Sequence, residues 1–256
     1  MIVVVPARLA SSRFPNKPLA AIAGLPMVEH VRRRAALVDG VDEVVVATCD
    51  EAIRRVVEEA GGRAVMTADT HVRCTDRVEE AARSLEGDII VIVQGDEPLL
   101  LPDAVRLTIE PLLRDEGVLC TNLLSVLRSA SDLGEPDIVK AACARNGDIL
   151  YFTRAAIPFR RAQGDAPVYR QTGIMALRQS LLSRYASLPE TPLERVESVD
   201  MLRLLEHGYR IRGVILDYDT IGVDRPGDIA RVEQVFREDP AQRALLARTL
   251  DPVMTG

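Results

Sequence analysis

The stretch that decides the fold is MIVVVPARLASSRFPNKPLAAIAGLPMV, residues 1–28. Its run IVVV at residues 2–5 is continuously apolar, which is typical of a strand buried on both faces of a parallel sheet. Pro6 has no amide proton to donate to a neighbouring strand, so we predict that the strand ends there.

The loop after this strand is rich in cations and hydroxyls. It carries Arg8, Arg13 and Lys17 together with Ser11 and Ser12. Open α/β folds bind their ligands at the carboxyl ends of the strands. Arginine presents a planar fork to phosphate oxygens and lysine a compact charge. We therefore predict a polyphosphate site in this loop, with a solvated basic loop as the alternative.

Lysine is scarce in this chain. Of the 32 basic residues only Lys17 and Lys140 are lysines, and the other thirty are arginines. A lysine in so arginine-biased a chain is expected to serve its own chemistry, because its small ammonium can move between phosphate oxygens. Chance placement remains the alternative for Lys140.

Composition excludes several classes of protein. The net charge of −6 disfavours a nucleic-acid binder, and 47% hydrophobic residues suffice for a good core. No run approaches the length of a membrane span and the chain starts with a strand, so we expect no membrane association and a cytoplasmic protein. The four cysteines and three histidines lack metal-binding spacing, so structural zinc is not expected.

Apolar runs alternate with amphipathic segments beyond the opening. We predict helices over 27–38, 51–60 and 78–85, and strands over 43–48, 64–66 and 88–93. In the first helix Arg32, Arg33 and Arg34 are expected on the solvent side, and Asp50 is expected to cap the second. This order predicts parallel strands joined by right-handed crossovers, with 88–93 at the sheet centre.

The pattern changes from about residue 118 to 178. Strand candidates at 119–125, 139–144, 149–152 and 174–176 lack long helices between them, which predicts a mixed or antiparallel extension. A single helix over 193–206, a strand over 210–216, a helix within 224–238 and a final helix from residue 240 complete the chain. Without a repeat or linker, we predict one α/β domain over residues 1–256, with a lobe at about 118–178.

Two carboxylates come directly after predicted strands. Asp96 is placed after the strand at 88–93, and Asp224 after a later strand, whereas glycine loops of the GxxxxGK and GxGxxG types are absent. Mg²⁺ is commonly held by one or two carboxylates with phosphate oxygens and water. The two residues could therefore hold Mg²⁺ against a triphosphate; a helix cap or a turn is the alternative for each.

Seven motifs complete the pattern, in the order PARLASSRFPNKPL (6–19), HVRCTDR (71–77), VQGDEP (93–98), PDIVK (136–140), YFTRAAIP (151–158), PLE (192–194) and GVDRP (222–226). In this order they resemble, nearly end to end, the CMP-Kdo synthetases, the cytidylyltransferases that activate 3-deoxy-manno-octulosonate (Kdo). The resemblance implies a mostly parallel, Rossmann-like nucleotidyltransferase sheet of the GT-A-like kind, with helices on both faces and a mixed extension. It also implies a homodimer formed through the lobe.

The resemblance further implies a reaction, in which an acceptor oxygen attacks the α-phosphorus of CTP and pyrophosphate leaves. Carried over from the motifs, the catalytic residues are Arg8, Lys17, Asp96 and Asp224, of which Asp96 and Asp224 bind Mg²⁺. The implied nucleotide-binding residues are Pro6, Ala7, Arg8, Arg13, Lys17, Arg73, Cys74, Arg77, Gln94 and Asp96. The implied acceptor-binding residues are Gln94, Lys140, Arg154, Arg170, Gln171, Met175, Glu194 and Glu197.

The chain departs from the family pattern at two places. Arg73-Cys74 replaces a Ser-Gly pair beside the nucleotide, and Gln171 and Met175 replace the His and Tyr that help hold the sugar acid. If the acceptor were unchanged, its buried polar groups would lose partners at a high energetic cost. CTP is therefore a firmer expectation than Kdo, and Arg73 would suit added negative charge on the acceptor.

These residues support three hypotheses. The first is a Mg²⁺-dependent cytidylyltransferase for a Kdo-like sugar acid. The second is the same chemistry with another small acid, such as a phosphonate in natural-product biosynthesis. The third, from a different class, is a nucleotide-binding regulator that has lost catalysis, although retention of Lys17, Asp96 and Asp224 argues against it.

Overall fold

The computed structural model describes residues 1–11, 13–164, 166–217 and 221–251. Its contacts divide the chain into two compact units. The first unit comprises Met1–Arg106 and Thr220–Gly256, and the second comprises Leu107–Asp219. No helix in the described part of the chain is long and apolar enough to cross a membrane.

The first unit is built on a parallel four-stranded sheet. Its strands are β1 (Ile2–Ala7), β4 (Glu43–Thr48), β5 (Arg63–Met66) and β6 (Ile89–Val93), in the spatial order β6-β1-β4-β5. Ile2 pairs with Glu43 on one side and with Ile90 on the other. All residues of β1 and β6 are buried, as continuous apolar runs predict for strands covered on both faces.

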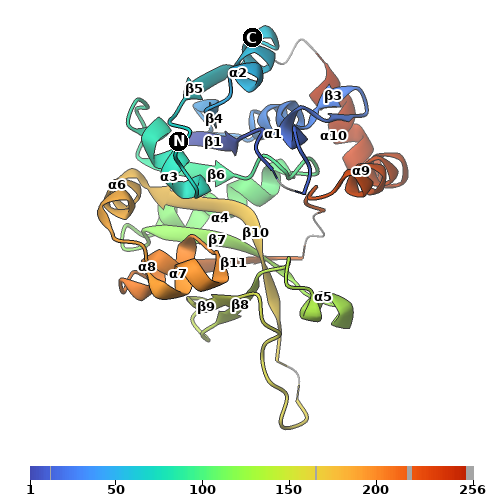
Figure 1. Cartoon of the computed structure of the whole chain (residues 1–256). Helices are drawn as coiled ribbons and strands as arrows, with labels where there is room; N and C mark the ends of the chain where they lie inside the picture. The colour runs from blue at the N-terminus through green and yellow to red at the C-terminus, as the bar shows by residue number, and fades with distance from the viewer. Residues whose placement is uncertain (12, 165, 218–220, 252–256) are drawn as a thin grey trace. The chain divides into compact units, whose positions relative to one another are not determined.

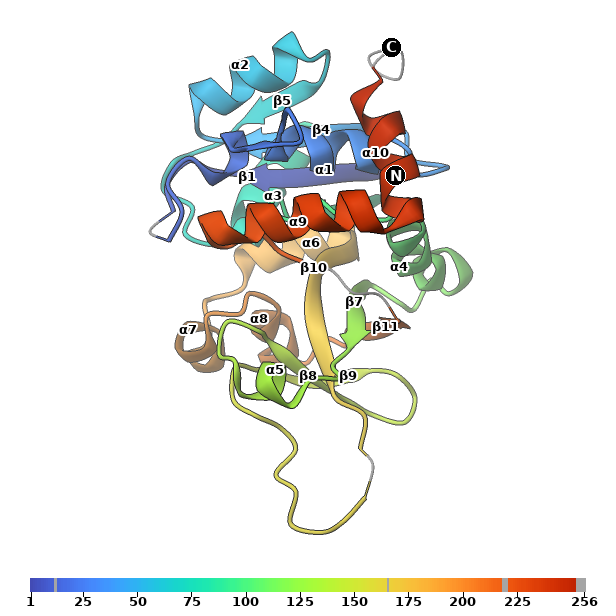
Figure 2. The same ribbon diagram turned by 90° about the vertical axis from the view of Figure 1, so that its right-hand side faces the viewer.

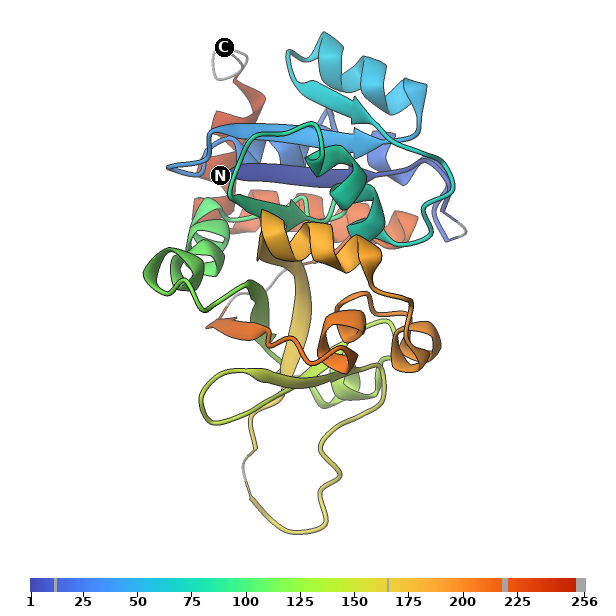
Figure 3. The ribbon, with the colours of Figure 1, turned by 90° about the vertical axis from the view of Figure 1, so that its left-hand side faces the viewer.

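Helices cover both faces of this sheet. They are α1 (Met27–Ala35), α2 (Glu51–Glu59), α3 (Cys74–Ala82), α9 (Pro226–Glu238) and α10 (Pro240–Leu250). Figure 1 shows them around β1 and β4, and the opposite views of Figures 2 and 3 show α1, α9 and α10 on one face and α3 on the other. The short elements η1 (Lys17–Leu19), β2 (Ala21–Ile22) and β3 (Leu25–Pro26) connect β1 to α1, and α4 (Pro102–Arg114) contains the boundary between the units.

The second unit has a mixed sheet. Strand β7 (Cys120–Val126) pairs in parallel with β11 (Arg212–Leu216) and antiparallel with β10 (Tyr169–Arg178). Strands β8 (Lys140–Cys143) and β9 (Ile149–Thr153) form an antiparallel pair, and β8 also pairs with β10. The predicted mixed extension is therefore confirmed. The helices of this unit are α5 (Ala130–Gly134), α6 (Gln179–Ser187), α7 (Pro192–Glu197) and α8 (Met201–Glu206).

Strand β1 continues one residue past Pro6, to Ala7, and three predictions about helices were wrong. The single helix expected over 193–206 is two helices, because Ser198 adopts a left-handed conformation at φ 55°. Arg32 and Arg34 are buried rather than solvated, since Arg32 pairs with Glu29 and Arg34 bonds to the Leu100 carbonyl.

The third concerns Asp50, which stands at the N-cap of α2 without capping it. Its Oδ2 instead accepts from the amide of Leu9, 2.8 Å away. Asp50 thus fastens the loop after β1.

Candidate active site

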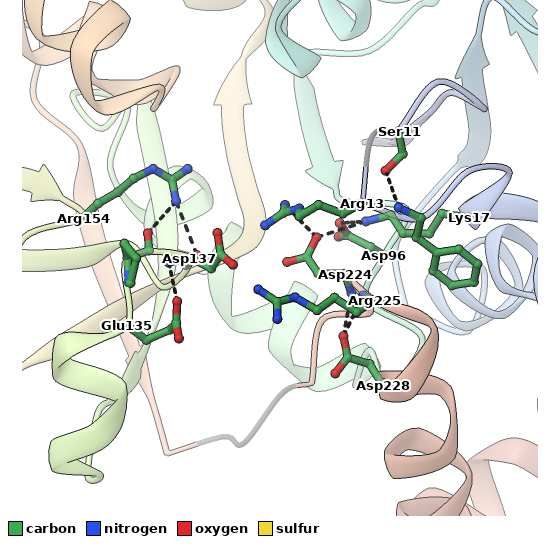
Figure 4. Close-up of polar contacts among 12 residues, drawn as sticks. Ser11, Arg13, Lys17, Asp96, Glu135, Asp137, Arg154, Asp224, Arg225 and Asp228 are labelled. Carbon is green, nitrogen blue, oxygen red and sulfur yellow. Dashed lines mark hydrogen bonds and ion pairs between the residues drawn. The ribbon is translucent and has the colours of Figure 1, made fainter.

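A lysine and two carboxylates converge in the first unit. Lys17 Nζ donates to Asp96 Oδ2 at 2.8 Å and to Asp224 Oδ1 at 3.4 Å (Figure 4). The three residues come from η1, from the turn after β6 and from the segment that leads into α9. The structure thus brings together three of the four predicted catalytic residues.

Main-chain contacts hold these segments in place. The amide of Val223 donates to the carbonyl of Asp96 at 2.9 Å, so the two carboxylate-bearing segments are tied directly. Gly95 allows the turn after β6 to approach β1, since a Cβ atom there would lie 2.9 Å from the carbonyl oxygen of Pro6. Asp228 accepts from the amides of Asp224 and Arg225 at 3.0 and 2.9 Å and so fixes the start of α9.

Lys17 is held as a cation. Burial lowers the pKa of Lys17, but the charges and hydrogen bonds of Asp96 and Asp224 outweigh burial, and the pKa is raised above its usual value. Its side chain is 15% exposed. A fixed positive charge at this position suits it to an anionic substrate.

Arg13 joins the same cluster from the loop after β1. Its NH2 donates to Asp224 Oδ1 at 3.0 Å, and its side chain is 47% exposed (Figure 4). Arg8 is also exposed, whereas Pro6 and Ala7 are buried at the end of β1. Ser12, part of the opening motif, lies outside the described residues.

The second motif lies at the start of α3. Gln94 Nε2 donates to Cys74 Sγ at 2.8 Å, which links two of the predicted nucleotide-binding residues. Arg73, which precedes Cys74 in the chain, is half-buried. Arg77 is buried and bonds to the Thr67 hydroxyl and to the Ala68 carbonyl. Its contacts thus brace the loop between β5 and α3.

The donor set fits a hard divalent cation. Asp96 and Asp224 both place an oxygen within 3.4 Å of one ammonium nitrogen, so they already share a cation. Mg²⁺ commonly takes one or two carboxylates and completes its shell with phosphate oxygens and water. Within the described residues there is no group of three or more His, Cys, Asp or Glu side chains placed to hold a metal.

In the second unit, the partners of Lys140 are main-chain carbonyls. Its buried Nζ donates to the oxygens of Glu135, Ile138 and Arg154 at 2.6, 2.8 and 2.7 Å. Burial lowers the pKa of Lys140. An ammonium has three protons, and these contacts use all of them. Lys140 thus joins the start of β8 to the end of β9, and its predicted acceptor contact has no support in this arrangement.

Glu194 is likewise engaged within the protein. It is fully buried and receives a bidentate pair from Arg203, at 2.8 and 2.6 Å. Its Oε2 also accepts from the amide of Thr191 in the capping box of α7. The Arg203 guanidinium lies 4.1 Å from the centre of the Tyr185 ring. These contacts tie α7 to α8 and α6.

Arg154 and Glu197, both predicted to bind the acceptor, contact each other. Glu197 accepts from the Thr153 hydroxyl at 2.6 Å and from the Arg154 amide at 2.9 Å, and its carbonyl accepts from Arg154 Nε at 2.8 Å. Although burial favours the neutral acid, the hydrogen bonds from Arg154, Thr153 and Tyr151 outweigh it and lower the pKa of Glu197. Arg154 NH1 further donates to the Pro136 carbonyl at 2.8 Å and lies 3.5 Å from the Asp137 carbonyl; Figure 4 shows Arg154 beside Asp137.

Gln171 and Met175 flank an irregularity in the pairing of β10 with β7. Gln171 Nε2 donates to Asn122 Oδ1 at 2.7 Å, and Asn122 Nδ2 donates to the Ile174 carbonyl at 2.9 Å. Met175 is buried, and Arg170 is half-buried next to Gln171. Asn122 was not among the predicted site residues, although a buried amide in β7 indicates a polar partner on a neighbouring strand.

A model of the cytidylyltransferase family matches residues 2–211. Together with the parallel sheet and the charged cluster beside it, this match defines the protein as an enzyme, a nucleotidyltransferase of the cytidylyltransferase class.

Individual relatives are more specific. The chain is 42% identical to the 3-deoxy-manno-octulosonate cytidylyltransferase of Geobacter metallireducens over 90% of this chain and 94% of the relative. It is 40% identical to that of Solibacter usitatus over 91% and 93%. A solved CMP:2-keto-3-deoxy-manno-octonic acid synthetase complexed with CTP matches with a TM-score of 0.88 and 38% identity over 93% of this chain and 98% of that chain. The chain belongs to the family of the 3-deoxy-manno-octulosonate cytidylyltransferases.

These comparisons confirm the family and the α/β nucleotidyltransferase fold predicted from the motifs. More distant structures share the fold alone, such as a cytidylyltransferase of Leptospira borgpetersenii with 16% identity and a TM-score of 0.63, over 96% of this chain and 92% of that chain.

Proposed function

We propose that this protein transfers CMP from CTP to an acidic, Kdo-like sugar acid, with release of pyrophosphate and with Mg²⁺ as cofactor. The observation that carries the proposal is the convergence of Lys17 on Asp96 and Asp224. Relatives at about 40% identity that are named for the 3-deoxy-manno-octulosonate reaction support the acceptor.

The reaction needs charge compensation more than covalent catalysis. A bond forms between an acceptor oxygen and the α-phosphorus of CTP, and the bond from that phosphorus to the bridging oxygen of pyrophosphate breaks. Negative charge grows on the leaving group, and fixed cations that face it lower the barrier. Lys17 and Arg13 would supply these cations, with Arg8 beside them on the same loop. Asp96 and Asp224 would hold Mg²⁺, which neutralises phosphate charge when bound.

Separate sets of residues would contact the nucleotide and the acceptor. The first unit holds the cation and carboxylate cluster together with Gln94, Cys74 and Arg73. In the second unit Arg154 and Arg170 would be the basic residues for the acceptor's carboxylate, because all three protons of Lys140 are used by main-chain carbonyls. A homodimer in the cytoplasm remains part of this proposal, on the strength of the family resemblance.

Two residues of the predicted acceptor site favour a different acceptor, a smaller acid. Gln171 is bonded to Asn122, and Met175 is buried where the family pattern has a tyrosine. Met175 offers no hydroxyl to a sugar acid, and the Nε2 of Gln171 already donates to Asn122, which favours a smaller acid such as a phosphonate.

The test is pyrophosphate release from CTP and Mg²⁺ with Kdo, other sugar acids and small phosphonates, each added singly. We expect release with at least one of them and none with Mg²⁺ chelated by EDTA. Absence of release with every acid, combined with tight CTP binding, would instead favour a non-catalytic nucleotide-binding regulator.

A further inference from the structure

Two cations share one oxygen of the proposed metal site. Arg13 NH2 lies 3.0 Å and Lys17 Nζ 3.4 Å from Asp224 Oδ1. Lys17 has a second carboxylate partner in Asp96 at 2.8 Å. Protein cations therefore contact the same carboxylates that would ligate Mg²⁺.

This arrangement is close to neutral. Two carboxylates face two cations within hydrogen-bond distance, so little net negative charge is left to attract a divalent ion. A metal approaching Asp224 would also meet the repulsion of Arg13 and Lys17 at short range. The free protein should consequently bind the metal weakly, although the donor set is suitable.

Lys17 and Arg13 differ in how firmly they are held at these carboxylates. Lys17 belongs to η1, is 15% exposed and is anchored by both carboxylates. Arg13 lies on the preceding loop and is 47% exposed, and its partner Asp224 is 39% exposed. A guanidinium binds phosphate oxygens bidentately, so a triphosphate offers Arg13 a better partner than one shared carboxylate oxygen.

We propose that Arg13 holds Asp224 in the nucleotide-free protein and releases it when its guanidinium transfers to the triphosphate, so that nucleotide and metal bind cooperatively. The proposal deepens the proposed function and rests on its use of CTP and Mg²⁺. Because coupling between two ligands is reciprocal, the same exchange makes the metal favour triphosphate binding. Arg13 thus weakens metal binding when no triphosphate is bound.

The first test is a titration of the nucleotide-free protein with Mn²⁺ alone, monitored by the electron paramagnetic resonance of free Mn²⁺. We expect Arg13→Gln to bind Mn²⁺ about tenfold more tightly than wild type. Arg231→Gln is the matched control, because Arg231 pairs with Asp228 on α9 at 3.5 Å and its loss changes the net charge equally. Adding Asp224→Asn to Arg13→Gln should abolish the gain. Equal affinities in wild type and Arg13→Gln, or equal gains in both arginine variants, would overturn the proposal.

The second test uses inorganic tripolyphosphate in EDTA, measured by calorimetry. Arg13→Gln should bind it about tenfold more weakly than Arg231→Gln does, because the guanidinium that moves to the phosphates is gone. An unchanged affinity would overturn the transfer of Arg13. Neither titration depends on turnover. Failure of the proposed function would appear separately, as absent pyrophosphate release from a protein that passes both tests.

Discussion

Lys17 Nζ lies 2.8 Å from Asp96 Oδ2, although 79 positions separate the two residues in the chain. The contact joins the loop after β1 to the turn after β6, two neighbouring parallel strands. Parallel strands carry their carboxyl ends to one edge of a sheet, which is where open α/β folds bind ligands. The pair thus marks the edge of the first unit's sheet where we propose that the nucleotide binds.

The first prediction concerns this lysine. Lys17→Gln removes the ammonium while keeping a polar side chain, and it leaves two carboxylates facing the triphosphate. We expect kcat/KM for CTP to fall by about 10²-fold or more, as for the loss of one positioned donor to developing charge. Initial rates of pyrophosphate release measure this. Lys17→Arg should recover little, because a planar fork does not replace a compact ammonium between two carboxylates. Full activity in Lys17→Gln would contradict the assignment.

The second prediction is that Asp224→Ala nearly abolishes turnover and leaves the fold intact. Asp224 is 39% exposed, and the hydrogen bond from its amide to Asp228 does not need its carboxylate. The circular dichroism spectrum and Tm should therefore stay close to wild type. Asp103→Ala, which removes a surface carboxylate at the start of α4, is the matched control and should be fully active. Normal turnover in Asp224→Ala would refute the metal assignment.

The meeting of Lys17 and Asp96 could be predicted from the sequence because local patterns place both residues. The apolar runs of β1 and β6 place the loop after each strand at one sheet edge, so Lys17 and Asp96 could be expected to meet. The partner of Arg13 was not predictable in this way. Any of several carboxylates could have paired with it, and tertiary contacts select Asp224: the packing of α9 against the β2 region and the hydrogen bond from Val223 to the Asp96 carbonyl.

In the second unit, too, the partners of buried side chains could not be predicted from the sequence. Lys140 and Glu194 lie in motifs, and motif membership alone predicts contact with substrate. The structure instead gives Lys140 three carbonyl partners and Glu194 a buried arginine. Such partners come from chain segments that fold around the side chain, and no periodicity of the sequence encodes them. The helix break at Ser198 and the burial of Arg34 were missed for the same reason.

The third prediction separates stability from binding at Glu194. Its carboxylate is fully buried and Arg203 is 7% exposed, so removing one partner leaves the other charge unpaired. Glu194→Leu should lower the free energy of unfolding by about 3–5 kcal/mol. Urea denaturation measures this loss, and the double variant Glu194→Leu/Arg203→Leu should recover part of it. A large rise in KM for the acceptor at unchanged stability would instead show that Glu194 binds the acceptor.

The fourth prediction concerns the acceptor. The double variant Gln171→His/Met175→Tyr restores the side chains of the family pattern beside Asn122. If the present residues define a changed pocket, this variant should gain at least about tenfold in kcat/KM for Kdo over wild type, since polar groups of the sugar acid regain partners. The KM for CTP should stay the same and serves as the internal control. Equal use of Kdo by both proteins would mean that Gln171 and Met175 do not select the acceptor.

The fifth prediction is a pH dependence of stability from His30. The side chain is fully buried on α1, its Nε2 lies 2.7 Å from the Ile22 carbonyl, and its ring centre is 5.6 Å from that of Phe236. Burial lowers the pKa of His30 to about 4, and Arg34 and Arg33 add to the effect.

A histidine with a lowered folded-state pKa takes up its proton first in the unfolded chain, whose histidines titrate near 6.5. The stabilising contribution is therefore complete above about pH 6.5 and is lost as pH falls toward about 4. A shift of this size corresponds to about 3 kcal/mol at most.

Urea denaturation at a series of pH values, from about 7.5 down to about 4.5, measures this loss of stability. His30→Gln keeps a donor for the Ile22 carbonyl and removes the titrating ring, so its free energy of unfolding should fall less steeply with acid than that of wild type. His207→Gln removes a solvent-exposed histidine and is the matched control. Parallel profiles for wild type and His30→Gln would show that burial of His30 does not control acid stability.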